Sequence, residues 1–236
     1  MMRFDIITIF PRIFDSYFGE SIIKRAQETK KVSFHVHNLR DYAENKHHQV
    51  DDKPYGGGAG MVLMAEPILK ACVNLKKKKR SEQEKEKVVI FSAKGKLFTQ
   101  KMAQDWAKKY DRLIFITGRY EGIDERVKKV LKAEEVSIGP YVLTDGDVAV
   151  MVAVSAVTRL IPGVITFESL KEESHWARVL SKEKKGDHMP SSGTLEYPHY
   201  TRPEVLEYNG KKYRVPKVLL SGNHKDIEKW RSEHRT

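Results

Sequence analysis

Short apolar runs alternate with amphipathic stretches along the first two thirds of the chain. The runs are rich in β-branched and aromatic residues and end at turn residues, as is typical of buried strands. The stretches between them place apolar side chains at helical spacing. The expected strands cover residues 4–10, 32–37, 88–92 and 113–116, and the expected helices cover residues 19–28, 65–75 and the segment that Thr99 caps. Strands alternating with helices predict an α/β domain with a parallel sheet over residues 1–166.

Neither the histidines nor the cysteine of the sequence indicates a metal site. His35 and His37 share the outer face of an alternating strand, but the sequence offers no third ligand beside them, so solvated histidines are the favoured interpretation. Cys72 is the single cysteine, which excludes a disulfide framework and a cysteine zinc site. We interpret Cys72 as a small buried side chain and expect a cytoplasmic protein.

Glycines lie in three segments that we interpret as loops at the ends of strands. They lie in the segments 91–95, 118–122 and 138–143, and the middle segment precedes a helix with Val127, Val130 and Leu131 on one face. Loops at this edge of an α/β sheet expose backbone groups and bind ligands. The charged residues of these loops are Lys94, Arg119 and Glu121, fewer than phosphates would need. The pattern favours a neutral adenosine held by backbone groups and apolar side chains.

Three further segments have a composition that predicts their surroundings in the fold. Residues 148–157 are almost wholly apolar, which predicts a helix buried in a large core or against a partner subunit. The glycine-rich segment 44–60 lacks the Gly-Lys-Ser/Thr ending of a phosphate loop, so its glycines are expected to lie close to a flat base or to another part of the chain. Residues 76–87 are interpreted as a solvated, charge-rich loop.

Bulk properties narrow the choice of partner. The net charge of +11 indicates a polyanionic partner or a basic soluble enzyme. No apolar run approaches the roughly 20 residues of a membrane helix, and the N-terminus does not have the pattern of a signal peptide. Residues 181–193 have the composition of a linker.

Several segments, in order and over nearly the whole chain, resemble the bacterial tRNA (guanine-N1)-methyltransferases of the knotted SPOUT class. These segments are 51–61, 117–127, 137–147, 159–164, 197–203 and 220–224. The resemblance implies a trefoil knot in residues 1–166, a linker over 167–195 and a short, mainly helical, tRNA-binding domain over 196–236. It also implies a homodimer, S-adenosylmethionine as methyl donor, tRNA as substrate, methylation at N1 of the guanosine 3′ of the anticodon, and magnesium dependence.

The same resemblance assigns roles to residues. The expected methyl-donor contacts are Ile90, Phe91, Gly118, Tyr120, Glu121, Gly122, Ile138, Gly139, Pro140, Tyr141, Val142 and Leu143. The expected catalytic residues are Arg159 and Glu173, with Ser174 and His175 left open as alternatives for the base; the expected substrate contacts are Gly58, Glu196 and Arg202. Pro140 and the run Asp145-Gly146-Asp147 depart from the family pattern, and Pro140 has no N–H to offer the donor.

Two other functions remain as alternatives. An RNA-binding relative that has lost catalysis would fit the uncertain base and the short C-terminal part. A nucleotide hydrolase is disfavoured because the phosphate loop is missing.

Overall fold

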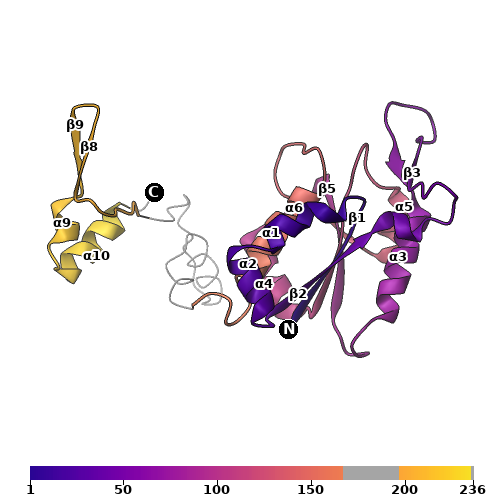
Figure 1. Cartoon of the computed structure of the whole chain (residues 1–236), viewed down its shortest axis with the longest axis horizontal. Coiled ribbons are helices and arrows are strands. Elements are labelled where there is room, and N and C mark those ends of the chain that lie inside the picture. The colour runs from indigo at the N-terminus through magenta and orange to yellow at the C-terminus, as the bar shows by residue number, and fades with distance from the viewer. Residues whose placement is uncertain (167–196, 235–236) are drawn as a thin grey trace, which may run out of the picture. The chain divides into compact units, whose positions relative to one another are not determined.

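A five-stranded, all-parallel sheet organises the N-terminal part of the protein, in the order β2-β1-β6-β5-β7. The structure is a computed structural model that describes residues 1–166 and 197–234. It divides into two units, Met1–Ile165 and Thr166–Thr236. In the N-terminal unit, α1, α2, α4 and α6 cover one face of the sheet and α3 and α5 cover the other (Figure 1). The expected parallel α/β domain is confirmed.

The strands of the N-terminal unit are β1 Met2–Thr8, β2 Val32–Asn38, β3 Asp51–Asp52, β4 Val62–Leu63, β5 Glu86–Leu97, β6 Arg112–Ile116 and β7 Glu134–Ser137. Its α-helices are α1 Asp15–Phe18, α2 Ser21–Glu28, α3 Ala65–Lys77, α4 Gln100–Lys109, α5 Glu125–Leu131 and α6 Asp147–Thr158, and its 3-10 helices are η1 Pro11–Phe14 and η2 Leu39–Tyr42.

The alternation of side chains along β1 divides the interior into two cores. Phe4 and Ile6 pack into the core under α4 and α6, whereas Ile7 packs into the core under α3 and α5. Strands that are buried on both faces consist almost entirely of apolar residues, and for this reason they could be predicted from the sequence. At the start of α4, the Thr99 hydroxyl accepts a hydrogen bond from the Met102 N–H (3.3 Å), so the expected cap is confirmed.

The interpretation of His37 as a solvated histidine is wrong. Its Nε2 lies 2.7 Å from Oδ1 of the fully buried Asp5, while His35 is exposed. Asp5 also accepts hydrogen bonds from Arg3 (2.8 Å) and Arg112 (2.7 Å). Burial opposes ionisation, but these partners together hold the pKa of Asp5 well below its usual range.

One expectation about a helix face is wrong, and a second stays a prediction. Val127 is fully buried on α5, but Val130 is 63% exposed, so the two do not share a buried face. On α6, Val148 and Val152 are exposed although the rest of the helix packs in the core. The core of this chain therefore does not cover the whole helix, and packing of the uncovered stripe against a partner subunit, the other expected alternative, stays a prediction.

The strand β5 continues beyond its expected end but bulges on the way. Val136 of β7 lies opposite both Phe91 and Lys96 of β5, so residues 92–95 bow out of the ladder. A Cβ on Gly95 would lie 2.5 Å from the Val136 backbone nitrogen, so only glycine fits at the base of the bulge. The bulge therefore supplies the loop that the sequence predicted at 91–95.

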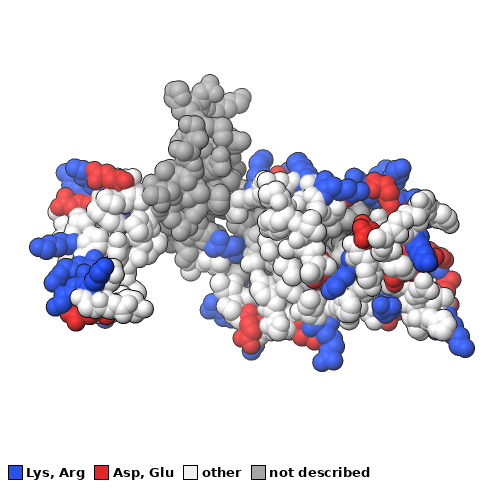
Figure 2. Space-filling view, turned by 90° about the horizontal axis from the view of Figure 1, so that it is seen from above, with Lys and Arg blue, Asp and Glu red and all other residues white. Residues whose placement is uncertain are grey.

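In the described residues of the C-terminal unit, a hairpin precedes two helices. The elements are β8 Val205–Tyr208, β9 Lys211–Arg214, α9 Lys217–Leu220 and α10 His224–Glu233. The helices were expected and the hairpin was not. Its turn, Asn209-Gly210, has positive φ at both residues, the geometry that suits a two-residue hairpin. Lys and Arg side chains are spread over both units (Figure 2).

Candidate functional site

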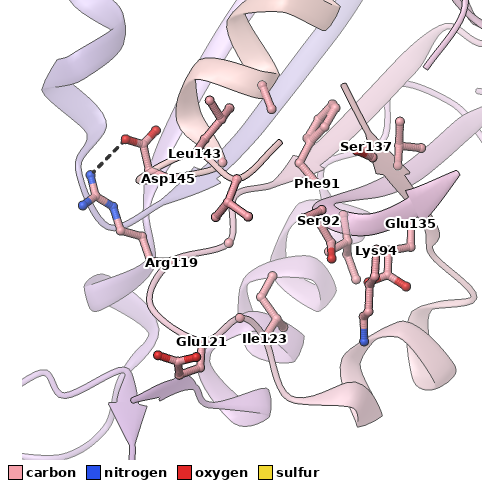
Figure 3. Close-up of a pocket in the computed structure, with 18 of the residues that line it drawn as sticks. Phe91, Ser92, Lys94, Arg119, Glu121, Ile123, Glu135, Ser137, Leu143 and Asp145 are labelled. Carbon is pink, nitrogen blue, oxygen red and sulfur yellow. Dashed lines mark ion pairs between the residues drawn. The ribbon is translucent and has the colours of Figure 1, made fainter. Parts of the chain in front are cut away.

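A cavity of about 440 Å³ opens at the carboxyl ends of β5, β6 and β7. Its walls are the β5 bulge, the loop after β6 and the loop between β7 and α6, which are far apart in the sequence (Figure 3). The three glycine-bearing segments therefore converge on one cavity. Its volume lies in the range of sites that enclose a small organic ligand, roughly 300–1,000 Å³.

Most of the expected methyl-donor contacts line this cavity. The ten that do are Ile90, Phe91, Gly118, Tyr120, Glu121, Gly122, Ile138, Tyr141, Val142 and Leu143. Gly139 and Pro140 are not among the lining residues. Gly139 is buried against the Tyr141 ring, whose hydroxyl donates to the Ile138 carbonyl (3.1 Å). Gly139 thus shapes the wall through Tyr141, and Pro140 is exposed outside it.

Two glycines bring two walls of the cavity into direct backbone contact. The Gly146 N–H donates to the Gly118 carbonyl (2.9 Å). A Cβ on Gly146 would lie 2.7 Å from the Gly118 nitrogen, so any other residue would push the loops apart. Gly146 was noticed in the sequence only as part of a departure from the family pattern, and the structure gives it this packing role.

One end of the cavity is lined by a quartet of charged side chains: Lys94, Glu125, Lys128 and Glu135. Lys94 and Glu135 lie side by side at this end in Figure 3. Lys94 Nζ lies 3.0 Å from Glu125 and 3.7 Å from Glu135, and Lys128 Nζ lies 2.7 Å from Glu135. Burial opposes the ionisation of Glu135, but Lys128, the Ser92 hydroxyl and Lys94 hold its pKa below the ordinary value. The quartet ties the β5 bulge to α5 and β7.

A second ion pair lies across the cavity from the quartet. Arg119 Nη2 lies 3.6 Å from Asp145, and the Arg119 guanidinium stacks 4.5 Å from the centroid of the Phe10 ring (Figure 3). Asp145 also accepts hydrogen bonds from the N–H groups of Asp147 (3.0 Å) and Val148 (3.2 Å), which cap α6. Arg119 therefore joins the loop after β6 to the start of α6.

The fully buried Asp147 anchors the first turn of α6 to β1. Its Oδ1 accepts a hydrogen bond from the Thr8 hydroxyl (2.7 Å). Burial raises the pKa of Asp147 above its ordinary value, and the hydrogen bonds from Thr8 and Thr117 oppose that rise. The side chain therefore fixes the helix that ends one wall of the cavity.

Acidic residues outnumber basic ones around the cavity, although the whole chain carries +11. The lining acids are Glu121, Asp124, Glu125, Glu135 and Asp145, and the lining bases are Lys94, Arg119 and Lys128. Among the described residues Glu121 forms no ion pair, whereas Asp124 pairs with Arg126 (2.6 Å). The cavity therefore favours a ligand with net positive charge.

The glycine-rich segment 44–60 ends beside the cavity. The Glu121 N–H donates to the Met61 carbonyl and the Leu63 N–H donates to the Gly122 carbonyl, both at 3.0 Å. Gly60 has φ +80°, and a Cβ there would lie 2.5 Å from Glu121 Oε1. Of the two purposes expected for the glycines of this segment, contact with another part of the chain is confirmed for Gly60. Gly58 has φ +124°, and a Cβ there would lie 3.9 Å from Cγ of Pro54, an ordinary contact.

Arg159 is not brought to the cavity of its own chain. Ala149, in the first turn of α6, is the last residue of that helix that lines the cavity, and Arg159 follows its last turn. At about 1.5 Å per residue these two positions are roughly 15 Å apart along the helix, farther than an arginine side chain reaches.

The remaining expected site residues lie elsewhere or cannot be placed. Arg202 is exposed in the C-terminal unit. Glu173, with its alternatives Ser174 and His175, lies outside the described residues, as does Glu196, and so does the expected linker 167–195.

The sequence missed the part of the site that comes from α5 and β7. Lys128 and Glu135 are ordinary surface types in the sequence, and nothing in their local spacing marks them. The pair Glu134-Glu135 is a weak sign of this part of the site. A carboxylate directly before a buried strand residue is itself partly buried and needs a basic side chain or a hydrogen-bond donor beside it.

Within residues 1–166 and 197–234, no three histidine, cysteine, aspartate or glutamate side chains are grouped so that they could hold a metal ion. No helix in the part of the chain that the structure describes has the length and apolar character needed to cross a membrane.

One family profile and several named relatives match nearly the whole chain. The profile of the family described as "tRNA (Guanine-1)-methyltransferase TrmD" matches residues 2–236. A tRNA (guanine-N(1)-)-methyltransferase of Thermomicrobium roseum is 48% identical over 98% of this chain and 77% of its own length. Proteins with the same name from Chloroflexus aggregans and Ruminiclostridium cellulolyticum are 47% and 46% identical, over 99% and 98% of this chain and 83% and 90% of their own lengths.

Proposed function

Because the chain belongs to the tRNA (guanine-1)-methyltransferase family, we propose that it methylates tRNA at N1 of the guanosine 3′ of the anticodon. The methyl donor is S-adenosylmethionine. The observation that carries the proposal on the structural side is the cavity lined by ten of the twelve expected donor contacts. The donor supplies an electrophilic methyl group on a sulfonium, and the chain supplies the surroundings of that group.

The residues of the cavity fit the donor. Apolar side chains such as Leu143 and Ile138 can cover the adenine, and the glycines of the three loops leave backbone groups accessible. The excess of acidic side chains suits the positive charge of a sulfonium. A phosphate-bearing ligand would meet repulsion from the same acids.

Attack by the guanine nitrogen requires two further groups. The nitrogen carries a proton, so a base must accept it, and negative charge develops on the guanine carbonyl oxygen, which a cation stabilises. We assign the cation to Arg159 and the base to Glu173, with Ser174 and His175 as the alternatives. Gly58, Glu196 and Arg202 are assigned to the tRNA.

The position of Arg159 supports a site shared between two copies of the chain. Arg159 lies roughly 15 Å along α6 from the nearest residue of that helix that lines its own cavity, beyond the reach of its side chain, so we assign it to the cavity of a partner. The exposed apolar side chains Val148 and Val152 on α6 provide a surface for that partner. We therefore propose a homodimer in which each cavity receives Arg159 from the other subunit.

Other parts of the proposal rest on family membership alone. They are a trefoil knot in residues 1–166, a linker over residues 167–195, tRNA binding by residues 196–236 and a cytoplasmic location. Magnesium dependence belongs with them, but the described residues offer no cluster of ligands for the metal, so we derive no step through it.

Transfer of a tritiated methyl group to an unmodified tRNA transcript tests the function. We expect label in a transcript with guanosine 3′ of the anticodon and none when that position is adenosine. Donor binding without transfer to either transcript would indicate instead an RNA-binding relative that has lost catalysis, and absence of donor binding would exclude both.

Mixing two inactive variants tests the shared site. One variant carries Arg159→Ala, and the other carries Gly146→Val, which pushes apart the two loops that form its own cavity and so disrupts the donor site. A mixed dimer regains one complete site, formed by the open cavity of the first variant and Arg159 of the second. Recovery of activity on mixing is expected, and no recovery from two dimeric variants would contradict the arrangement.

A further inference from the structure

The two faces of the β8–β9 hairpin differ in their chemistry. Leu206 lies opposite Tyr213 and Tyr208 lies opposite Lys211, and because alternate residues share a face, these four side chains lie on one side. Glu207 and Lys212 lie opposite each other on the other side and form an ion pair (2.8 Å). One face is therefore apolar and aromatic with a cation, and the other is polar.

The aromatic face is not covered by the rest of the described chain. Leu206 and Tyr213 are each 53% exposed and Tyr208 is 64% exposed. Lys211 forms no ion pair with another described residue, in contrast to Lys212. A hairpin gains little stability from apolar side chains left in water, so such a face is typical of a binding surface.

The charge around this face favours an anionic partner. The hairpin carries Lys211, Lys212 and Arg214 against one acid, Glu207. Residues 197–234 as a whole carry eight lysines and arginines against five aspartates and glutamates. Basic side chains outnumber acidic ones on the face of this unit seen in Figure 2. Exposed rings next to unpaired cations are the combination that holds single-stranded nucleic acid.

We propose that the aromatic face of the β8–β9 hairpin binds RNA, with an unpaired base stacked on Tyr208 or Tyr213 and a phosphate paired with Lys211. The two tyrosines are diagonal neighbours across the strands, a spacing of roughly 7–8 Å that leaves both rings open to a base. This surface deepens the proposed function and rests on it, because the RNA is the tRNA substrate. The hairpin is a binding surface and takes no part in the chemistry.

Paired substitutions on the full-length protein test stacking. Tyr208→Leu and Tyr213→Leu remove a flat ring while keeping apolar bulk, and Tyr208→Phe and Tyr213→Phe keep the ring. Affinity for a fluorescent unmodified tRNA transcript is measured by anisotropy. At least one of the two leucine variants is expected to bind at least fivefold more weakly, and each phenylalanine variant is expected to bind within twofold of the wild type.

Lysine substitutions on opposite faces test the phosphate contact. Lys211→Ala is expected to reduce the slope of log affinity against log salt by about one. Lys212→Ala is the matched control, because it removes the same charge from the other face, where the lysine is paired with Glu207. Equal effects of the two substitutions would overturn the assignment of a specific face.

Further measurements separate this proposal from its alternatives. The affinity for the methyl donor, measured by calorimetry, is expected to be unchanged in every hairpin variant. A wild-type protein that does not bind the donor but still binds RNA through the hairpin would refute the proposed function and not the hairpin proposal. Leucine variants with unchanged RNA affinity would refute the hairpin proposal alone. If the leucine variants instead alter the oligomeric mass or the unfolding temperature, the face is a protein contact and the proposal is wrong.

Discussion

Replacing Gly95 by alanine would test how rigidly the β5 bulge is held against β7. The new Cβ would lie 2.5, 2.6 and 2.7 Å from the backbone nitrogen, carbonyl carbon and Cα of the fully buried Val136. Ordinary contact begins near 3.4 Å, so the two backbones must separate by about 0.9 Å. Val136 pairs with β5 on both sides of the bulge, so neither strand can move alone.

Overpacking of this kind costs about 1–3 kcal/mol. If the bulge keeps its shape, this cost is expected to appear as a lower free energy of unfolding. If the bulge relaxes outward, the cost is expected to appear as weaker donor binding, since 1.4 kcal/mol corresponds to a tenfold change in affinity. Chemical denaturation and calorimetry with S-adenosylmethionine, performed on the same preparation, measure the two contributions.

Gly222→Ala provides the control for this substitution. Gly222 has φ +70°, and no atom lies within 4 Å of the position that its Cβ would take, so alanine there costs about 1–2 kcal/mol of backbone strain and should leave donor affinity unchanged. A Gly95→Ala protein with wild-type unfolding free energy and wild-type donor affinity would show that the packing against Val136 does not constrain the bulge.

Three further predictions follow from buried or capping groups. Asp5→Asn should lower the free energy of unfolding at pH 7 by about 3–5 kcal/mol, because Arg112 loses its ionised, buried partner. Since the pKa of Asp5 is depressed in the folded protein, the wild type should lose this stabilisation as the pH falls below about 4. Urea unfolding of the variant with the same acid dependence as the wild type would contradict this. Burial raises the pKa of Cys72 to about 12, so alkylation at pH 8 should follow unfolding, and fast labelling of the folded protein would refute it. Asp145→Ala should lower the stability measured by thermal denaturation by about 1 kcal/mol, because the α6 cap is lost, and should weaken donor binding. Asp145→Asn should keep much of the cap and remove only the ion pair with Arg119, so its effects should be smaller. Equal losses of stability and donor affinity in the two variants would contradict the contribution of the cap.

The sequence predicted the parts of the fold that local periodicity encodes. The β6 strand is apolar at almost every position because both faces are buried, and Thr99 carries a side chain suited to capping. The hairpin β8–β9 was missed although Asn209-Gly210 is a strong turn signal, because its strands lack an apolar alternation that a core would impose.

Prediction of the site stopped where contacts depend on tertiary structure. The three glycine loops were recognised, and the structure brings them together around one cavity. The pairing of Glu135 with Lys94 and Lys128, the contact of Gly146 with Gly118, and the hydrogen bond of His37 with the buried Asp5 join residues from different elements. No spacing rule within a segment reports such contacts.

The surplus of carboxylates around the cavity has a consequence for turnover. Once the methyl group has left, the spent donor has lost one positive charge, so it is attracted less by Glu121 and its neighbours than a fresh molecule is. At the distances and effective dielectric of an open site, one charge is worth about 1 kcal/mol, a severalfold difference in affinity. The lining thus helps to exchange product for substrate, and added salt should narrow the difference.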